Sequence, residues 1–122
     1  MPKLETNHSL HNHHENCDQI IAQIPNDTAM VKACDIFQLL SDPTRLKILW
    51  LLAHSEQCVN NVALAVNMSA PAVSHHLRVL RQSGLTVNRR EGKEMYYKLS
   101  PDKTPTLVHQ IIDDIFEMDC LR

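Results

Sequence analysis

Apolar residues recur at intervals of three and four along most of the chain, and this spacing is typical of amphipathic helices. The pattern predicts helices over residues 15–24, 27–40, from 43 onward, 58–66, 69–83 and 104–120. The helix from residue 43 shows four apolar residues at i, i+3, i+4 and i+7. They are Leu46, Leu49, Trp50 and Ala53. This spacing is typical of an amphipathic helix.

The segment from Cys58 to Leu80 predicts two short helices joined by a tight turn. Asn67-Met68-Ser69 forms the connection, because Asn accepts a left-handed backbone and Ser can cap the helix that follows. Val73, Leu77 and Leu80 lie at i, i+4 and i+7 of that helix, which predicts a buried stripe. Two short helices with a turn of three to four residues are typical of a helix-turn-helix.

A β-hairpin is predicted directly after these helices. Gly84 ends the second helix, and residues 85–89 and 95–99 have the composition of strands. Between them, Arg90-Glu91-Gly92-Lys93 forms a turn in which Gly92 can adopt a positive φ. A basic hairpin beside a helix-turn-helix is a wing. The predicted fold class is therefore mainly α with a small β-hairpin, a winged helix-turn-helix.

Composition and charge exclude several classes of protein. With 122 residues the chain is one domain in size, and its net charge of −2 excludes a globally basic nucleic-acid binder. Between Arg78 and Lys98, however, six basic residues stand against two acidic ones, which indicates a local surface for a polyanion. No apolar run approaches the ~18 residues of a membrane span. The N-terminus lacks the order of a signal peptide, so we expect a cytoplasmic protein with reduced cysteines and no membrane partner.

Three runs of residues, in order along the chain, resemble the ArsR/SmtB family of winged-helix repressors. They are Leu-Ser-Asp-Pro-Thr-Arg-Leu-Lys-Ile-Leu at 40–49, Ala-Val-Ser-His-His-Leu-Arg-Val-Leu at 72–80, and the hairpin at 90–97. The similarity covers about residues 27–120. It implies a homodimeric transcriptional repressor on a palindromic operator, which leaves the DNA when an inducer, usually a metal ion, binds.

The expected organisation has two parts. Residues 1–25 form a flexible arm that carries His and Cys, and residues 26–122 form the winged helix-turn-helix and dimerisation domain. We expect the dimer to use N- and C-terminal helices. The last helix has an apolar set too wide for one shallow contact, which is typical of a dimer interface. This set comprises Leu107, Val108, Ile111, Ile112, Ile115 and Met118.

The second helix of the helix-turn-helix is expected to lie in the major groove of operator double-stranded DNA. Polar side chains near its N-terminus then face base edges, and Ser69, Ser74 and His75 are placed to do so. Basic side chains contact phosphates, which hold the register without reading sequence. We assign that role to Arg78, Arg81, Arg89, Arg90 and Lys93. His76 stands beside the buried stripe and is equally well explained as a structural hydrogen-bonding residue.

The family resemblance places one sensor site at the start of the first helix of the helix-turn-helix. There the family often has Cys-Val-Cys or Cys-Val-Gly-Asp, completed by Cys or His from an N-terminal extension. This chain has Cys58-Val59-Asn60-Asn61, which keeps only the first ligand. Thiolate with imidazole suits Zn²⁺, and soft sulfur suits Cd²⁺ or Pb²⁺. The ligands indicated are Cys17, Cys58, His13 and His14, with His8 and His11 as further candidates.

A second family site lies on the last helix and is shared across the dimer. In this chain the first half of its motif falls on residues that cannot ligate as required, and the second half falls on Asp114 and Glu117. His109, Asp113 and Glu117 follow one another at i, i+4 and i+8. A relocated, oxygen-rich zinc site at His109, Asp113, Asp114 and Glu117 is therefore an alternative. The simpler interpretation is a dimer helix with an acidic outer face.

Other functions stay open. Cys34 and Cys120 are candidates for a redox or persulfide sensor, although Cys34 falls on an apolar stripe, where packing is the simpler role. Cys17 and Cys58, joined by Cys34, offer the three thiolates that suit arsenite. A metal-buffering protein would explain the histidines but not the helix-turn-helix. We expect no enzyme, because no nucleophile motif or Gly-rich phosphate loop is present.

Overall fold

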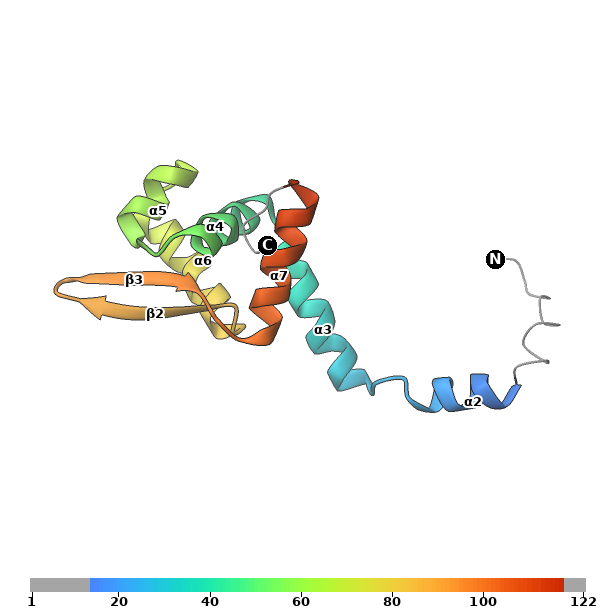
Figure 1. Ribbon diagram of the computed structural model, residues 1–122. Helices are drawn as coiled ribbons and strands as arrows, with labels where there is room; N and C mark the ends of the chain where they lie inside the picture. The colour runs from blue at the N-terminus through green and yellow to red at the C-terminus, as the bar shows by residue number, and fades with distance from the viewer. Residues whose placement is uncertain (1–13, 118–122) are drawn as a thin grey trace. The chain divides into compact units, whose positions relative to one another are not determined.

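A computed structural model describes residues 14–117 of the chain. The elements follow one another as α2 (His14–Ala22), α3 (Asp27–Leu40), α4 (Pro43–His54), β1 (Gln57–Cys58), α5 (Val59–Val66), α6 (Ala70–Gln82), β2 (Thr86–Glu91), β3 (Glu94–Leu99) and α7 (Lys103–Ile115) (Figure 1). This arrangement confirms the prediction of a mainly helical fold with a small β-hairpin. Within the described residues, no helix has the length and apolar character needed to cross a membrane.

The chain divides into two units at a boundary inside α3, after Cys34. The described part of the first unit consists of α2 and the first part of α3. The side chain of Asn26 accepts a hydrogen bond from the backbone N–H of Ala29 at 2.9 Å, which caps α3. No residue of α3 is buried within the single chain.

The second unit begins with the end of α3 and continues into α4. Asp42 is the N-cap of α4, and its carboxylate accepts a hydrogen bond from the backbone N–H of Arg45 at 2.9 Å. Pro43 occupies the first turn, where its missing N–H removes no helical hydrogen bond. The predicted restart of the helix at this point is confirmed.

The apolar spacing correctly predicted α4, and both Leu46 and Trp50 pack against the core, but they are not its most buried residues. Of the four spaced residues only Leu49 is buried, whereas Leu46, Trp50 and Ala53 are half-buried. The buried residues are Ile48, Leu49 and Leu52. The reason is tertiary: α4 contacts α5, α7 and β3, so the orientation of its buried face depends on three neighbours rather than on one. Because α4 is apolar on most sides, its sequence alone could not show which side faces the core.

The helix-turn-helix is formed by α5 and α6, as predicted. Asn67 ends α5 in the left-handed conformation, with φ 57° and ψ 50°. Ser69 is the N-cap of α6, and its hydroxyl accepts a hydrogen bond from the backbone N–H of Ala72 at 3.3 Å. The stripe Val73, Leu77 and Leu80 is completely buried. The local sequence signals and the packing therefore agree in this motif.

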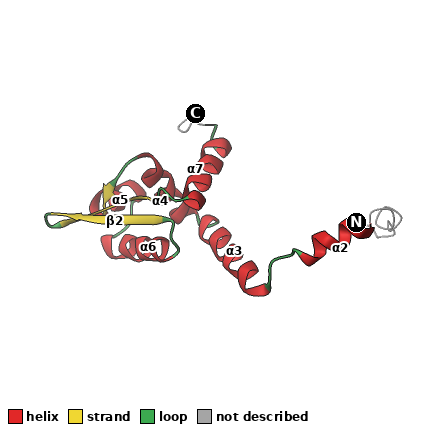
Figure 2. Cartoon of the chain, turned by 60° about the horizontal axis from the view of Figure 1, so that its bottom comes forward, coloured by secondary structure: helices red, strands yellow, loops and turns green. Residues whose placement is uncertain are grey.

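The sheet has three antiparallel strands in the order β1-β3-β2. Gly92 turns the hairpin with φ 65°, and Gly84 leads into it with φ 85°. The two-residue strand β1 was not predicted. Cys58, expected to begin a helix, lies in β1 opposite Tyr96 and also serves as the N-cap of α5. Figure 2 shows β2 alongside α6, and the two elements are in contact.

The core of the second unit joins α4, the helix-turn-helix, the start of the hairpin and α7. Its buried members are Ile48, Leu49, Leu52, Val62, Ala63, Val66, Val73, Leu77, Leu80, Leu85, Val108 and Ile112. The last helix is shorter than the predicted 104–120, because α7 ends at Ile115. Glu117 lies beyond its end with φ 59° and therefore does not extend the helical face of His109 and Asp113.

Candidate nucleic-acid interface and metal cluster

The outer face of α6 carries the predicted base-contacting residues. Ser69 and His75 are exposed, and Ser74 is half-buried. Arg78 and Arg81 are also exposed, one and two turns further along the face that begins at Ser74. The opposite face holds the fully buried stripe, so the two faces of α6 differ completely in solvent access. The helix thus presents hydroxyl, imidazole and guanidinium groups on a rigid, well-packed support.

The hairpin contributes exposed basic side chains of two kinds. Arg90 and Lys93 are exposed and form no ion pair with any residue in the described part of the chain. Arg89 instead donates to Glu56 from Nε at 2.8 Å and from Nη2 at 2.9 Å, and donates from Nη1 to Glu91. Its guanidinium also lies 5.1 Å from the centroid of the Tyr96 ring.

These contacts partly neutralise Arg89. The hydrogen bonds to Glu56 and then Glu91 raise the pKa of Arg89 above its ordinary value, while the hydrogen bond from Arg89 lowers the pKa of Glu56. Glu56 lies between α4 and β1, so the pair joins that connection to the wing. A DNA phosphate that binds Arg89 must displace two carboxylates. A phosphate that binds Arg90 or Lys93 does not have to displace a carboxylate of any described residue.

His76 lies on α6 between the exposed face and the buried stripe. Its Nδ1 atom is buried and has no hydrogen-bond partner among the described residues. Its charge contributes a small part of the lowered pKa of Asp42, of which the backbone N–H of Arg45 is the main cause. Among the described residues, the structure therefore shows no structural hydrogen bond from Nδ1 of His76.

The predicted thiolate ligands fall in different units. Cys17 is half-buried on α2, and Cys34 is exposed at the end of the first unit, so packing of Cys34 within the single chain is wrong. Cys58 is buried at the start of α5 in the second unit. His14 lies in α2, whereas His8, His11, His13 and Cys120 lie outside the described residues.

A different group of ligand-type side chains meets where the end of α4 approaches α7. His54, His109 and Asp113 offer one ligand atom each, and these atoms lie within 4.8 Å of one another. Nε2 of His54 is 3.6 Å from Oδ1 of Asp113, and Nε2 of His109 is 3.4 Å from Oδ2 of the same carboxylate. The edge of the His109 ring faces the His54 ring, with the centroids 5.0 Å apart.

This cluster is mostly enclosed. His109 is 8% exposed and Asp113 is 4% exposed, and the side chain of His54 is 19% exposed. Nε2 of His109 and both carboxylate oxygens of Asp113 are buried without a hydrogen-bond partner among the described residues. Buried polar atoms normally have such partners, so this group calls for a physical explanation. Asp114 and Glu117, the other members of the predicted alternative site, are exposed and are not part of the cluster.

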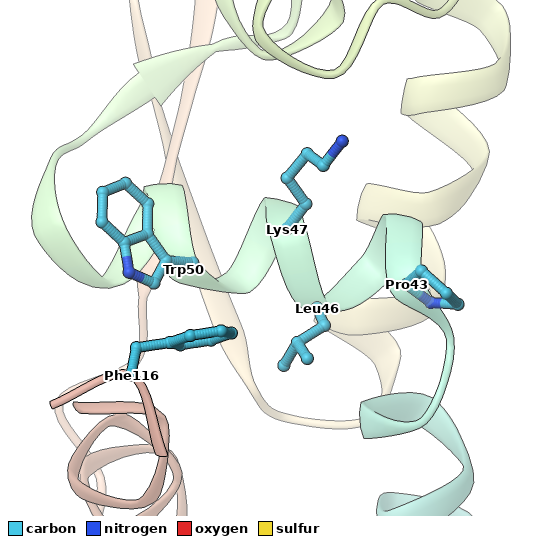
Figure 3. Close-up of a pocket in the computed structure, with 5 residues that line it drawn as sticks. All are labelled: Pro43, Leu46, Lys47, Trp50 and Phe116. Atoms are coloured by element: carbon cyan, nitrogen blue, oxygen red, sulfur yellow. The ribbon is translucent and has the colours of Figure 1, made fainter. Parts of the chain in front are cut away.

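Two surface cavities flank this region. One, of about 350 Å³, is lined by His54 and His109 together with residues of β3 and of the connections on either side. The other, of about 360 Å³, is lined by Pro43, Leu46, Lys47, Trp50 and Phe116 (Figure 3). The second cavity is almost wholly apolar and contains no metal ligand. Trp50 lies at its edge, and its ring stacks on His54 with the centroids 4.3 Å apart.

Sequence reasoning did not include His54 in any site. The i, i+4 spacing of His109 and Asp113 was visible, but their third partner is far away along the chain and on another helix. A histidine in the last turn of α4, four residues after the only tryptophan, was the one local signal. That signal gains meaning only when α4 and α7 are packed together.

Comparisons with known proteins place the chain among bacterial regulators. Residues 42–86 match the family described as "Bacterial regulatory protein, arsR family". The chain is 34% identical over 107 residues to the transcriptional repressor SmtB homolog of Synechocystis sp., covering 88% of this chain and 81% of the relative. It is 40% identical over 85 residues to the arsenical resistance operon repressor of Escherichia coli, covering 69% of this chain and 72% of the relative.

Two further likenesses extend this finding. The cadmium resistance transcriptional regulatory protein CadC homolog of Staphylococcus aureus is 40% identical over 89 residues, 72% of this chain and 69% of the relative. The homodimeric winged helix-turn-helix DNA-binding domain Mb0332 of Mycobacterium bovis matches with a TM-score of 0.64 and 26% identity, over 79% of this chain and 90% of that one. The first is named as a transcriptional regulatory protein, and the second is described as a possible ArsR-family transcriptional regulator. The chain belongs to the ArsR/SmtB family of winged helix-turn-helix transcriptional regulators.

Proposed function

We propose that this protein is a repressor that binds a palindromic operator as a homodimer and leaves it when a metal ion or arsenite binds. The observation that carries the proposal is the contrast between the two faces of α6. Val73, Leu77 and Leu80 fix the helix on the core, while His75 and Arg78 stand in solvent on the other face. An exposed polar helix face on a rigid support is the form in which proteins read a major groove.

The hairpin extends this surface along the DNA backbone. Arg90 and Lys93 supply charges that no acidic side chain in the described part of the chain neutralises, so they are the better phosphate ligands. Arg89 is held by Glu56 and contributes less. The proposal therefore keeps Ser69, Ser74, His75, Arg78, Arg81, Arg90 and Lys93 as DNA contacts and gives Arg89 mainly a structural role.

Dimerisation is supported by apolar surface that a single chain leaves uncovered. On α7, Leu107, Ile111 and Ile115 are 45%, 50% and 65% exposed and recur every four residues, so they share one face. The Mycobacterium bovis domain is homodimeric, which supports the same assembly here. Two α6 helices reading successive half-sites must lie about 34 Å apart, one turn of DNA.

The proposed inducer binds thiolates. Two relatives are named for arsenical and cadmium resistance, and soft ions favour sulfur ligands. Cys58 is the buried thiol nearest to the helix-turn-helix in sequence, and Cys17 is a half-buried thiol of the N-terminal unit. We propose these two cysteines, joined by His13 or His14, as the site for Zn²⁺, Cd²⁺ or Pb²⁺. Arsenite on Cys17 and Cys58, and a redox pair of Cys34 and Cys120, are the alternatives.

The test of DNA binding starts from selection of a preferred site in a random duplex library with the full-length protein. Arg78→Gln and Arg90→Gln are each expected to weaken binding and to lower the salt slope by about 0.9 per lost phosphate contact. Arg89→Gln is the matched control on the same hairpin and is expected to change the slope less. Absence of any enriched site, or equal losses for Arg89→Gln and Arg90→Gln, would contradict the proposed interface.

The inducer is tested by release from the selected duplex with zinc, cadmium, lead, arsenite and a persulfide donor. Cys58→Ser is expected to abolish release by cadmium, because it removes a soft ligand. Cys34→Ser serves as the matched control and is expected to retain it. If Cys34→Ser alone abolishes release, the redox alternative replaces the proposed site. Release that survives Cys58→Ser places the inducer elsewhere.

A further inference from the structure

The junction between the end of α4 and the middle of α7 holds three side chains that share one chemistry. We propose that His54, His109 and Asp113 bind a divalent cation of the zinc type within one chain. This site is separate from the thiolate site proposed above and is formed by residues of the second unit alone. It does not depend on operator binding, because it can be measured in the absence of DNA.

The distances suit such an ion. A tetrahedral Zn²⁺ holds nitrogen and oxygen ligands at about 2.0–2.1 Å, which places neighbouring ligand atoms about 3.4 Å apart. The two His–Asp distances are 3.4 Å and 3.6 Å. All three ligand atoms lie within 4.8 Å of one another, so closing them around one ion takes side-chain movements of about 1 Å. The backbone helices already bring the ligands together.

The hydrogen bonding of His54 directs the correct atom toward the cluster. Nδ1 of His54 lies 2.6 Å from the backbone carbonyl oxygen of Trp50. A carbonyl oxygen only accepts, so Nδ1 carries the hydrogen and Nε2 of the neutral ring has a lone pair. Nε2 is the atom that faces Asp113. Histidine ligands of metals are typically held by such a second hydrogen bond to a carbonyl or carboxylate.

The carboxylate of Asp113 and Nε2 of His109 have no hydrogen-bond partner among the described residues. The lone pair of His54 faces one of the two carboxylate oxygens, and both oxygens are buried. Electron-rich atoms that face one another need a positive charge between them. That charge is either a proton, on a ring or on the carboxyl, or a cation. A cation can contact both rings and the carboxylate at once, whereas one proton joins only two atoms.

The cavity of about 350 Å³ beside the cluster offers access. His54 and His109 both line it, so an ion can reach the ligands from solvent, and water can take the fourth position. Glu56 and Lys98 line the same cavity with opposite charges. Two imidazoles and one carboxylate favour zinc over the softer cadmium and lead, which prefer sulfur. The two sites of this protein should therefore differ in metal preference.

The only tryptophan of the chain reports directly on this site. The Trp50 ring stacks on His54, so binding of an ion at His54 changes the environment of the indole. The experiment titrates zinc into the full-length Cys17→Ser/Cys58→Ser variant, which lacks the proposed thiolate site. We expect a change in Trp50 fluorescence that saturates at one zinc ion per chain, and a weaker response to cadmium.

Three variants in that background test the ligands. His54→Gln and Asp113→Asn are each expected to lower zinc affinity at least tenfold, measured by competition with a chromogenic chelator. His75→Gln removes an exposed histidine from α6 and is expected to leave zinc affinity unchanged. Circular dichroism checks folding. If Asp113→Asn fails to fold, His54→Gln decides the matter, because His54 is partly exposed and the His109–Asp113 pair stays in place.

Two results would overturn the proposal. Zinc affinity and fluorescence response that are the same in His54→Gln as in its parent would show that the cluster is an ion pair held by a proton. A loss in His75→Gln equal to that in His54→Gln would show non-specific binding by surface histidines. Loss of operator binding in any of these proteins would concern the proposed function alone, because the titrations contain no DNA.

Discussion

The outer face of α6 and the junction of α4 with α7 both carry polar side chains, but in opposite settings. On α6, His75 and Arg78 stand in water, and the apolar stripe beneath them is fully buried. At the junction, His109 and Asp113 are themselves buried beside the core residues Val108 and Ile112. The first arrangement follows the ordinary division between a polar surface and an apolar core. The second places ligand-type atoms mostly out of contact with solvent, with access only through the cavity that His54 and His109 line.

This difference explains what each region is able to do. Exposed polar groups are hydrated, so they cost no stability and remain available to a large anionic partner. Buried groups without hydrogen bonds are costly, so they persist only where something compensates them. A surface for DNA can therefore be recognised from one helix, whereas a buried ligand cluster is recognised from groups that different elements bring together.

The largest expected effect tests how the buried face of α6 packs against the core. Leu77→Ala removes a fully buried side chain and is expected to lower the free energy of unfolding by about 2–5 kcal/mol. Leu64→Ala is the matched control in the same helix-turn-helix, because Leu64 is 81% exposed, and it is expected to change stability by about 0.5 kcal/mol or less. Urea denaturation measures both. Equal losses in the two variants would contradict the assignment of the faces.

The next largest expected effect is the stabilisation of the fold by zinc at the junction of α4 with α7. If zinc binds the native cluster, free zinc at 100 times its dissociation constant stabilises the fold by about 2.7 kcal/mol. Thermal unfolding of Cys17→Ser/Cys58→Ser with zinc and with chelator measures this stabilisation. The added His54→Gln change is expected to remove it. A melting temperature that zinc raises equally in both proteins would place the stabilising ion elsewhere.

A smaller effect separates two roles of one residue at the start of α6. Ser69 caps the helix and is also a proposed base contact, so Ser69→Ala is expected to cost about 1 kcal/mol of stability as well as DNA affinity. Ser69→Asp restores a capping oxygen and is expected to recover stability. Its negative charge repels DNA, so affinity for the selected duplex stays low. If Ser69→Asp recovers both stability and affinity for the selected duplex, Ser69 does not contact the DNA.

The smallest expected effect concerns the ion pair between Arg89 and Glu56, which joins the wing to the rest of the second unit. Hydrogen bonds from Arg89 hold the pKa of Glu56 below its ordinary value of 4.5. The unfolded chain binds a proton at Glu56 more readily than the folded protein does. The ion pair therefore contributes its full stability at pH values above the ordinary pKa of Glu56. That stability is lost as the pH falls through the lower pKa of the folded protein. Both side chains are partly solvated, so the contribution is small.

Denaturation at neutral pH and at pH about 3 measures this dependence. Glu56→Gln is expected to show a slightly smaller loss of stability on acidification than the unchanged protein. The matched control is Glu94→Gln, a second exposed glutamate of the hairpin that forms no ion pair with any described residue. An identical pH dependence for all three proteins would show that the pair contributes nothing.

Several features of the fold can be predicted from the amino-acid sequence because short-range signals specify them. The turn at Asn67, the cap at Ser69 and the stripe beginning at Val73 each depend on residues within one or two turns. Asn26 and Asp42 cap their helices for the same reason. Such local consistency makes the winged helix-turn-helix predictable with correct boundaries to within a few residues.

Other features depend on tertiary packing. The apolar spacing at Leu46 and Trp50 predicted α4, but its contacts with three elements bury Ile48 and Leu52 more completely. The predicted last helix was too long, because Phe116 already ends it. The strand β1 exists only because β3 pairs with it, and a two-residue strand leaves no pattern in the sequence. The neutralisation of Arg89 by Glu56 joins residues 33 positions apart.

By itself, the sequence determined the family, the order of elements and which side of α6 meets solvent, because hydrophobic periodicity and helix caps act over a few residues. The tertiary structure decided which charges remain available and which ligands meet. Arg89 and Arg90 are neighbours in the chain and differ in their partners, and His54 joins His109 and Asp113 only through the contact of α4 with α7. Proximity between distant residues is a property of packing, and no local pattern encodes it.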